Sequence, residues 1–364
     1  CSFFSLTDRT TLSRMALVLV VAAVAVAVIP TPSLWVEQLY SQQVYLIWQR
    51  GLTSMSSLVG FSLLDPLLVL LLFGGGLWWW RTIRRAGKGE RWRAIARMSL
   101  NTVGVGALFY LLFVSVWGLN YRREPLTAKL DYDQSDVNAS SLAALSEQAV
   151  TQLNELYAVA NSRRWPSFDE LPARFTTAFN EAQQRLGVQR TAVVGRPKIT
   201  LLSAYFQRAG IDGMMNPFVL EVLVNEGVLS YERPFLVAHE WAHLAGYANE
   251  SEASFVGFLI CLAGDAQSQY SAWLFLLPQL VRNLAEPARA EIYAGLEHGP
   301  RQHLVEVAAR LRSAVPLVRQ SANRVYNQFL RANRVSEGIA SYGLVVNLIL
   351  GTSETATWRG LVGP

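Results

Sequence analysis

The stretch His239-Glu-Trp-Ala-His243 decides how this chain is interpreted. Residues four apart on a helix project from one face, so the two imidazoles can reach a single metal ion. Pro234 stands where a helix begins and Gly246 where it ends, which predicts a helix over 234–246. Because the whole chain has only four histidines, a chance occurrence of the pattern is improbable. The stretch therefore predicts a metal site on a helix.

The donors of this motif are typical of zinc. Zinc binds histidine nitrogens at about 2.0–2.1 Å in near-tetrahedral geometry. Glu240 follows the first histidine directly, which suits a carboxylate that acts on water as a general base without ligating the metal. Since histidine and carboxylate also accept Fe, Co, Ni and Mn, the native metal stays open. We expect Zn²⁺ as the cofactor and Glu240 as the catalytic residue.

A catalytic zinc usually has three protein ligands and an open position. Two acids, Glu250 and Glu252, begin the next expected helix. The pattern Glu-x-x-Ala-Ser from Glu250 resembles the Glu-x-x-Ala-Asp ligand helix of many zinc peptidases, which favours Glu250 as third ligand beside His239 and His243. Glu252 is the alternative, and either acid could instead stabilise the helix N-terminus. His298 and His303 have no motif around them, and we expect them at the surface.

The composition indicates that part of the chain lies in lipid. Of the 364 residues, 51% are hydrophobic and 16% charged, against a typical charged share of about 25%. Mean hydropathy is +0.22. Aromatic residues make up 11%, which excludes a disordered chain. The two cysteines, Cys1 and Cys261, exclude a disulfide scaffold, and Cys261 lies in an apolar run where a buried thiol is expected.

Three apolar runs are long enough to span a membrane. They cover about residues 12–29, 61–80 and 98–119. Trp78-Trp79-Trp80 closes the second run as an interfacial belt. Residues 30–60 are interpreted as a loop. The run Ser271–Val281 is too short to span and contains a proline, so we expect it to be a buried or membrane-resting helix.

The basic residues predict the orientation in the membrane. Seven of the 32 lie in the segment 81–97, between two apolar runs. This clustering argues against nucleic acid as a partner, despite a net charge of +5, and favours a loop facing an anionic leaflet. We therefore predict a membrane anchor over residues 1–120, with the N-terminus and loop 81–97 in the cytoplasm. Residues 121–364 would form an extracytoplasmic domain, and the lipid bilayer is the expected partner.

The outer domain is predicted to be α+β and mostly helical. Lys198–Ser203 and Phe218–Val224 are interpreted as strands. The expected helices are 140–163, 168–186, 234–246, 250–264, 268–284, 286–297, 301–313, 320–332 and 335–350.

Several stretches resemble an uncharacterised family of bacterial membrane-anchored zincin-like proteins, known as a domain of unknown function. The stretches are Trp117–Arg122, Gly213–Phe218, His239–Gly246, Glu250–Phe255, Tyr326–Leu330 and Glu337–Gly343. The resemblance implies a zincin-like domain, in which the motif helix packs beneath a sheet and substrate adds to an edge strand. Phe218–Val224 is the candidate for that edge, with an ordinary core strand as the alternative. Ser254 stands where such motifs often carry Asn or Asp to hydrogen-bond a ligand histidine.

These observations predict a zinc metallopeptidase in the bacterial plasma membrane. It would hydrolyse a protein or peptide substrate with zinc-activated water and Glu240 as general base. Tyr231, Tyr326 and Tyr342 are candidates for a further donor to the developing oxyanion. Two alternatives stay open: a non-catalytic scaffold or sensor with a structural metal, and a zinc amidase acting on cell-wall peptides.

Overall fold

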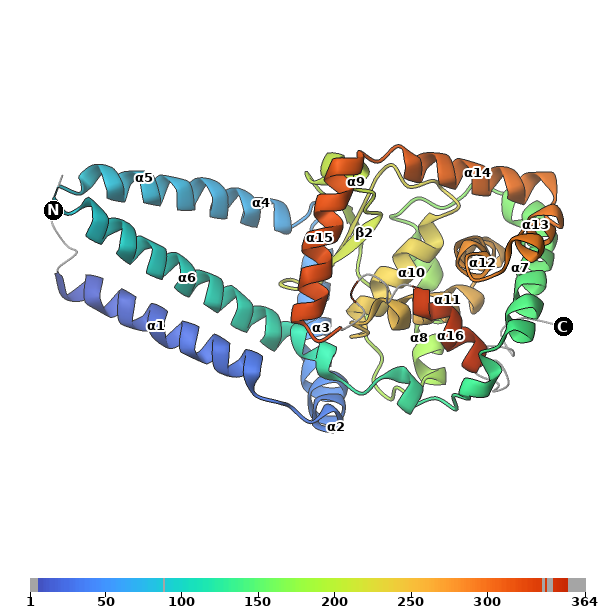
Figure 1. Cartoon of the computed structure of the whole chain (residues 1–364), viewed down its shortest axis with the longest axis horizontal. Coiled ribbons are helices and arrows are strands. Elements are labelled where there is room, and N and C mark those ends of the chain that lie inside the picture. Colours follow the sequence, from blue (N-terminus) through green and yellow to red (C-terminus); the bar gives the residue numbers. More distant parts are fainter. Residues whose placement is uncertain (1–5, 88, 336–337, 339–342, 353–364) are drawn as a thin grey trace.

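Long apolar helices project from one side of a mostly helical domain in the computed structural model (Figure 1). The structure describes residues 6–87, 89–335, 338 and 343–352. The projecting helices are α1 (Leu6–Val28), the continuous rod of α4 (Leu64–Val69), η2 (Leu70–Gly74) and α5 (Gly75–Arg85), and α6 (Arg91–Val116). The chain end marked N and the α5–α6 connection lie at one end of these helices, and the domain lies at the other.

Two of the projecting helices are long and apolar enough to cross a membrane by themselves. They are Leu64–Arg85, with 22 residues, and Arg91–Val116, with 26. A third span results only if Ser13–Val28 is joined to Ser33–Ser57, and these two segments are bent by 109°. The structure thus supports two or three spans. The third apolar run ends three residues earlier than predicted, because the chain turns at Trp117 into the short helix η3 (Gly118–Arg122).

The segment 30–60 is helical, so its interpretation as a loop was wrong. It forms α2 (Ser33–Trp35), η1 (Val36–Val44) and α3 (Tyr45–Ser57). These helices pack against the domain: the Tyr45 hydroxyl donates to the Leu244 carbonyl at 2.8 Å, and Thr53 Oγ1 donates to the Leu220 carbonyl at 2.9 Å. The segment carries too many polar residues for an apolar run, and its buried face meets a partner nearly 200 residues away in sequence.

Most helices of the domain follow the predicted ranges, except that α9 begins where a strand was predicted and α16 covers only the later part of the predicted range 335–350, of which residues 336–337 and 339–342 lie outside the described residues. They are α7 (Ala139–Asn161), α8 (Leu171–Arg185), α9 (Ser203–Ala209), α10 (Arg233–Leu244), α11 (Glu250–Leu262), α12 (Ala266–Val281), α13 (Glu286–Ala294), α14 (His298–Arg312), α15 (Pro316–Ala332) and α16 (Val345–Gly351). Short helices η4 (Leu126–Ala128) and η5 (Gln134–Asp136) precede them. The core is densest around α11, whose residues are all buried, including the free thiol of Cys261. The prediction of a mostly helical domain with few strands is confirmed.

One small sheet lies beside α10. Its strands are β1 (Pro197–Ile199), β2 (Gly213–Asn216) and β3 (Glu221–Val224), in the order β1-β3-β2. β3 runs parallel to β1 and antiparallel to β2. The central strand is therefore β3, which overturns its assignment as the edge strand. All four β3 residues are buried, as expected for a strand with neighbours on both sides.

A buried ion pair connects this sheet to the projecting apolar helices. The Lys198 ammonium donates to Glu221 at 2.9 Å, and neither side chain is exposed. Glu221 also accepts the backbone N–H groups of Leu63 and Leu64 at 3.0 and 2.9 Å, where α4 begins. Asn216 of β2 donates to the same carboxylate at 3.0 Å. One carboxylate therefore connects all three strands to the start of an apolar projecting helix.

We expect Lys198→Met to destabilise the protein by about 3–5 kcal/mol, because it leaves the Glu221 charge buried without a cation. The matched control is Arg185→Ala, which removes the partly exposed Arg185–Glu181 pair and should leave the unfolding midpoint nearly unchanged. Denaturant unfolding of the detergent-solubilised protein measures both. Equal midpoints for the two variants would contradict the role given to the buried pair.

Candidate metal centre

The helix α10 presents His239 and His243 from a fully packed position. Glu232 precedes its first turn and Pro234 lies within that turn. The Trp241 indole donates to the Gly195 carbonyl at 2.8 Å, which fixes the helix to the segment before β1. The chain leaves the helix at Gly246, whose φ of +88° requires glycine. The predicted helix over 234–246 is confirmed, with its end two residues earlier.

The helix α11 approaches α10 closely enough to bring a carboxylate to the histidines. Asn249 caps α11, since its side chain accepts the Ser251 N–H at 2.9 Å. Further along, a Cβ added at Gly257 would lie 3.0 Å from the His239 backbone nitrogen. Only the absence of a side chain there lets the two helix backbones lie in contact. The first residue of α11, Glu250, consequently reaches the motif face of α10.

The ligand atoms of His239, His243 and Glu250 converge. Glu250 Oε2 lies 3.2 Å from His239 Nε2 and 3.4 Å from His243 Nε2, and all three ligand atoms lie within 4.8 Å of one another. Donors placed about 2.0–2.1 Å from a tetrahedral metal are about 3.3 Å apart. The two measured separations match this value.

The Nδ1 atom of each imidazole lies beside a polar group of the protein, which orients the ring. The His243 Nδ1 atom lies 2.8 Å from the Tyr247 carbonyl. In the neutral ring with the proton on Nδ1, that N–H donates to the carbonyl and the lone pair of Nε2 faces Glu250. His239 Nδ1 lies 3.3 Å from Ser254 Oγ. Ser254 thus occupies the position of a histidine-orienting partner, as its place in the motif predicted.

The residues present fit a zinc ion. Two imidazoles and one carboxylate are the donor set of an open catalytic site. Glu250 Oε2 is buried and accepts no hydrogen bond by the usual geometric criteria, although it lies between the two rings. A divalent cation would satisfy this oxygen. Among the residues that the structure describes, no fourth His, Cys, Asp or Glu joins the group.

The other candidate ligands lie elsewhere. The Glu252 carboxylate accepts the Leu126 N–H at 2.7 Å, which takes it away from the histidines. His298 is exposed, as expected. His303 is half-buried. Its ring stacks on Tyr231 with ring centroids 3.9 Å apart, and its Nδ1 lies 2.8 Å from the Tyr270 hydroxyl. The structure therefore groups Glu250 with the histidines, while metal ligation itself stays a prediction.

Glu240 and Glu250 are buried in opposite electrostatic surroundings. Burial raises the pKa of Glu240 to about 8, against a lowering by nearby His243. Burial also acts to raise the pKa of Glu250, but the two histidines outweigh it and hold that pKa well below its usual range. Burial lowers the pKa of His243, and the Glu250 charge reverses this and raises it to about 9. A metal ion would take the place of the proton that His243 holds.

The edge strand β2 crosses directly over Glu240. A Cβ added at Gly213 would lie 2.7 Å from Glu240 Oε1 and 3.0 Å from a methyl group of Leu236. An alanine there would force the Glu240 carboxylate or the Leu236 side chain to shift. This strand was not predicted, because Gly-Met-Met-Asn has little β-propensity.

One of the three candidate tyrosines reaches the centre. Tyr326, on α15, donates its hydroxyl to Glu250 Oε1. Tyr231 instead donates to Glu306 at 2.7 Å, which places it outside the group. Tyr342 lies outside the described residues.

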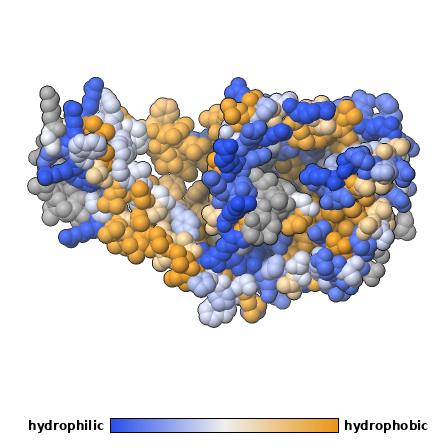
Figure 2. Space-filling model, in the orientation of Figure 1, coloured by the Kyte–Doolittle hydropathy of each residue, from blue (hydrophilic) through white to orange (hydrophobic). Residues whose placement is uncertain are grey.

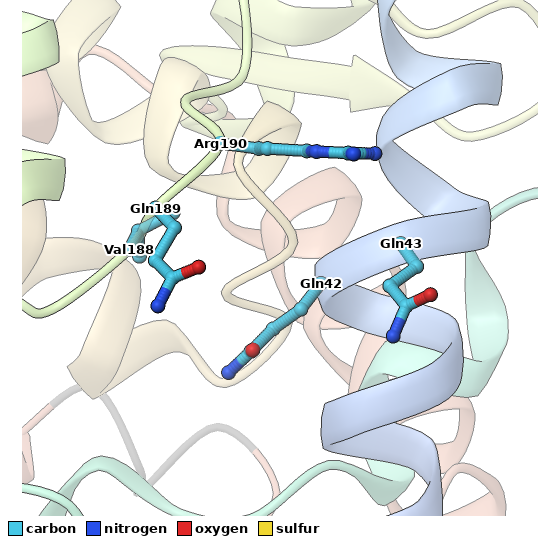
Figure 3. Close-up of a pocket in the computed structure, with 5 residues that line it drawn as sticks. All are labelled: Gln42, Gln43, Val188, Gln189 and Arg190. Atoms are coloured by element: carbon cyan, nitrogen blue, oxygen red, sulfur yellow. The ribbon is translucent and has the colours of Figure 1, made fainter.

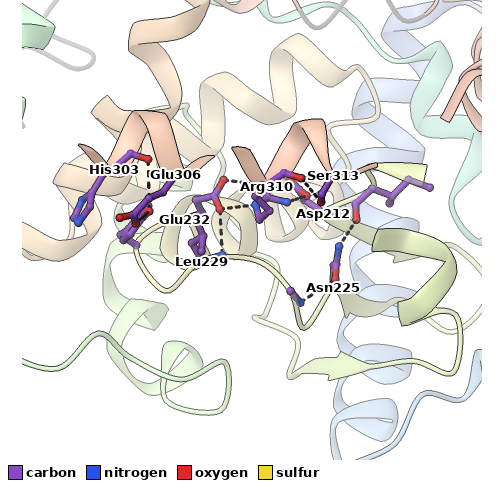
Figure 4. Close-up of polar contacts among 11 residues, drawn as sticks. Asp212, Asn225, Leu229, Glu232, His303, Glu306, Arg310 and Ser313 are labelled. Carbon is purple, nitrogen blue, oxygen red and sulfur yellow. Dashed lines mark hydrogen bonds and ion pairs between the residues drawn. The ribbon is translucent and has the colours of Figure 1, made fainter. Parts of the chain in front are cut away.

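Two residues that support the centre were not found from the sequence. The Trp117 indole donates to the His243 carbonyl at 3.0 Å, and its ring lies 6.3 Å from the His243 ring. Arg310 donates to Asp212 at 2.6 and 3.0 Å and to Glu232 at 2.7 and 2.8 Å (Figure 4). Asp212 immediately precedes β2 and Glu232 precedes α10, so this guanidinium fixes the strand relative to the motif helix. No local sequence pattern signals such a pairing.

A separate polar cavity of about 320 Å³ lies between η1 and the loop after α8 (Figure 3). Gln42, Gln43, Val188, Gln189 and Arg190 line it. None of these residues belongs to the histidine–glutamate group, so the cavity is not part of the candidate centre.

The comparisons with known proteins identify the family. The model of a family described as "Protein of unknown function (DUF3810)" matches residues 40–350. The chain therefore belongs to this family, which is consistent with the resemblance to an uncharacterised family. No curated protein and no solved structure matches the chain.

We expect purified wild-type protein to bind about one zinc per chain and Glu250→Ala to bind none, because a three-ligand site loses its only anionic donor. Glu252→Gln is the matched control, since Glu252 contacts Leu126 instead, and it should keep the metal. Elemental analysis after zinc loading at neutral pH measures the three proteins. Zinc retained in Glu250→Ala and lost in Glu252→Gln would reverse the assignment of the third ligand.

Proposed function

We propose that this protein is a membrane-anchored zinc metallopeptidase with a zincin-like domain. The observation that carries the proposal is that the ligand atoms of His239, His243 and Glu250 lie together, with Glu240 on α10 beside the two histidines. This arrangement offers three metal ligands, an open position and a buried base, which are the parts that metal-assisted hydrolysis of an amide needs.

The chain's own residues supply the proton transfers. A zinc ion bound there would polarise a substrate carbonyl and acidify water. The Glu240 carboxylate is buried, and its Oε2 has no hydrogen-bond partner among the described residues, so it is available to accept the proton of the attacking water. It then returns that proton to the leaving amine nitrogen. Tyr326 orients Glu250, and the edge of β2 can pair with an extended peptide.

The proposed topology has three spans and an outward-facing domain in the bacterial plasma membrane. It is supported by the basic segment 81–97 and the domain lying at opposite ends of the apolar helices (Figure 1); most of that segment forms the ends of α5 and α6, so its prediction as a loop was wrong. The excess of basic residues at the loop end favours the cytoplasm for that end.

The same residues would also serve an amidase acting on cell-wall peptides, because both reactions hydrolyse an amide. A purely structural metal in a scaffold or sensor fits less well. Structural zinc sites are closed by four protein ligands, whereas the described residues bring three together.

We expect Glu240→Gln to lower peptide hydrolysis by about 10²–10⁴-fold with zinc content unchanged, because the amide cannot accept the water proton. Glu155→Gln, at an exposed position of α7, is the matched control and should keep full activity. A mixed peptide library, analysed by mass spectrometry, supplies the rates. An unchanged rate in Glu240→Gln, with metal bound, would refute the proposed function.

We expect Gly213→Ala to lower the rate by about 100-fold, because the added methyl displaces Glu240 and a shift of about 1 Å costs that much. Zinc content should hold, since the variant leaves the three ligand side chains in place. Gly51→Ala is the control, as nothing lies within 4 Å of a Cβ added there. Equal rates in the two variants would show that β2 does not approach Glu240 as described.

A further inference from the structure

The candidate centre lies directly against the outer end of a membrane helix. Trp117 follows Val116, the last residue of α6, and its indole donates to the backbone carbonyl of the ligand His243. Tyr45 makes the same kind of contact to the next carbonyl, that of Leu244. The Trp117 side chain thus links the end of a span to the end of α10 that carries His243. Tryptophan at the end of a span marks the membrane–water interface.

The edge strand leads from Glu240 to the flank of the same helix. β2 passes Glu240 at Gly213 and ends at Asn216. Two residues later, Phe218 packs edge-to-face on Phe109 of α6, with ring centroids 5.6 Å apart. Phe109 precedes the end of α6 by seven residues, which is about 10 Å along the helix axis. The turn after β2 therefore reaches the depth of the apolar helices.

A peptide paired with β2 would follow the same path. Among the described residues, β2 pairs only with β3, so its other edge can accept an extended segment. A strand advances about 3.3 Å per residue, so the three steps of β2 from Gly213 to Asn216 cover about 10 Å, and Phe218 follows two residues later in the turn. The peptide bond positioned beside Glu240 would then lie about five residues from the point at which the peptide reaches the membrane helices.

The side of the domain next to the membrane helices is basic. The helix α15 lies between those helices and α10 (Figure 1). It carries exposed Arg319, Arg324 and Arg331 and no acidic residue. Figure 2 shows this hydrophilic strip beside the apolar surface of the projecting helices. The ring of Phe329 on α15 packs against that of Phe113 near the end of α6, with ring centroids 5.7 Å apart. Such a helix suits contact with anionic lipid headgroups.

We propose that the substrate is a membrane-anchored polypeptide, cut in an extended segment within about five residues of the bilayer surface, the distance that β2 sets. This inference rests on the proposed peptidase function. In the reaction, the oxygen of water bonds to the carbonyl carbon and the C–N bond breaks. Glu240 carries the proton to the leaving nitrogen, so that a carboxylic acid and an amine result. The anchored product stays in the membrane, and the other leaves into solution.

The test uses the full-length, zinc-loaded protein in vesicles of phosphatidylethanolamine and phosphatidylglycerol. Three peptide pools share one randomised segment of about ten residues. In the near pool it adjoins an apolar helix of about 20 residues, which spans the bilayer. In the far pool a Gly/Ser spacer of about 20 residues, about 25 Å in mean reach, separates the two. In the soluble pool the helix is replaced by a polar tail. The near and far pools are equally concentrated at the membrane, so their comparison isolates the distance.

We expect the near pool to be cut at least about tenfold faster than the far pool, as the approach of β2 to α6 fixes the distance. The cuts should cluster within about five residues of the helix, which mass spectrometry reads directly. The Phe218→Ser variant should lower the near-to-far ratio, because it removes the contact with Phe109. Tyr205→Ser, at an exposed aromatic position on α9, is the matched control for that ratio.

Two results would overturn the inference, and they differ in what else they overturn. If all three pools are cut at similar rates, and Glu240→Gln abolishes the cutting, the inference fails while the peptidase function stands. If the zinc-loaded wild type cuts no pool, both the inference and the proposed function fail. The rates at which the wild-type protein cuts the three pools test the inference even if Phe218→Ser does not fold.

Discussion

The structure of the candidate centre depends on one close contact between two helices. Gly257 lets α11 lie against the backbone of α10 at His239, and this contact carries Glu250 to the two imidazoles. A carboxylate buried that deeply is stable only beside cationic or metal partners. The same contact that fills the core therefore sets the ligand spacing, and a larger residue at 257 would separate the helices and the ligands together.

The projecting apolar helices and the domain form one folded unit around this contact. Glu221 joins the sheet to the start of α4, and Trp117 joins the end of α6 to the motif helix. Helix α3 adds a third connection at Leu244. These contacts cross residue 120, which the sequence marks as the boundary of the anchor. The apolar helices consequently help to position the centre.

The sequence predicted what depends on local patterns and missed what depends on distant partners. The motif helix and most helix ranges followed from spacing and caps, and the grouping of Glu250 rather than Glu252 with the histidines followed from the resemblance to the ligand helix of zinc peptidases. Strand β2, the helices of 33–57 and the Arg310 contacts did not. Each of these is stabilised by residues far away in sequence, and a short strand such as Gly-Met-Met-Asn has no periodicity to reveal it.

The two buried glutamates show how environment divides chemistry between like groups. Glu250 faces two imidazoles, so its charged form is favoured and it suits a permanent ligand. Glu240 faces the backbone of β2 and apolar Leu236, so burial dominates and its pKa rises to about 8. Burial at that position favours the protonated form of Glu240, which suits a group that carries a proton from water to a leaving nitrogen in the proposed reaction. Because the two residues differ in what packs against them rather than in type, the strand that confines Glu240 is as important to the proposed reaction as the motif itself.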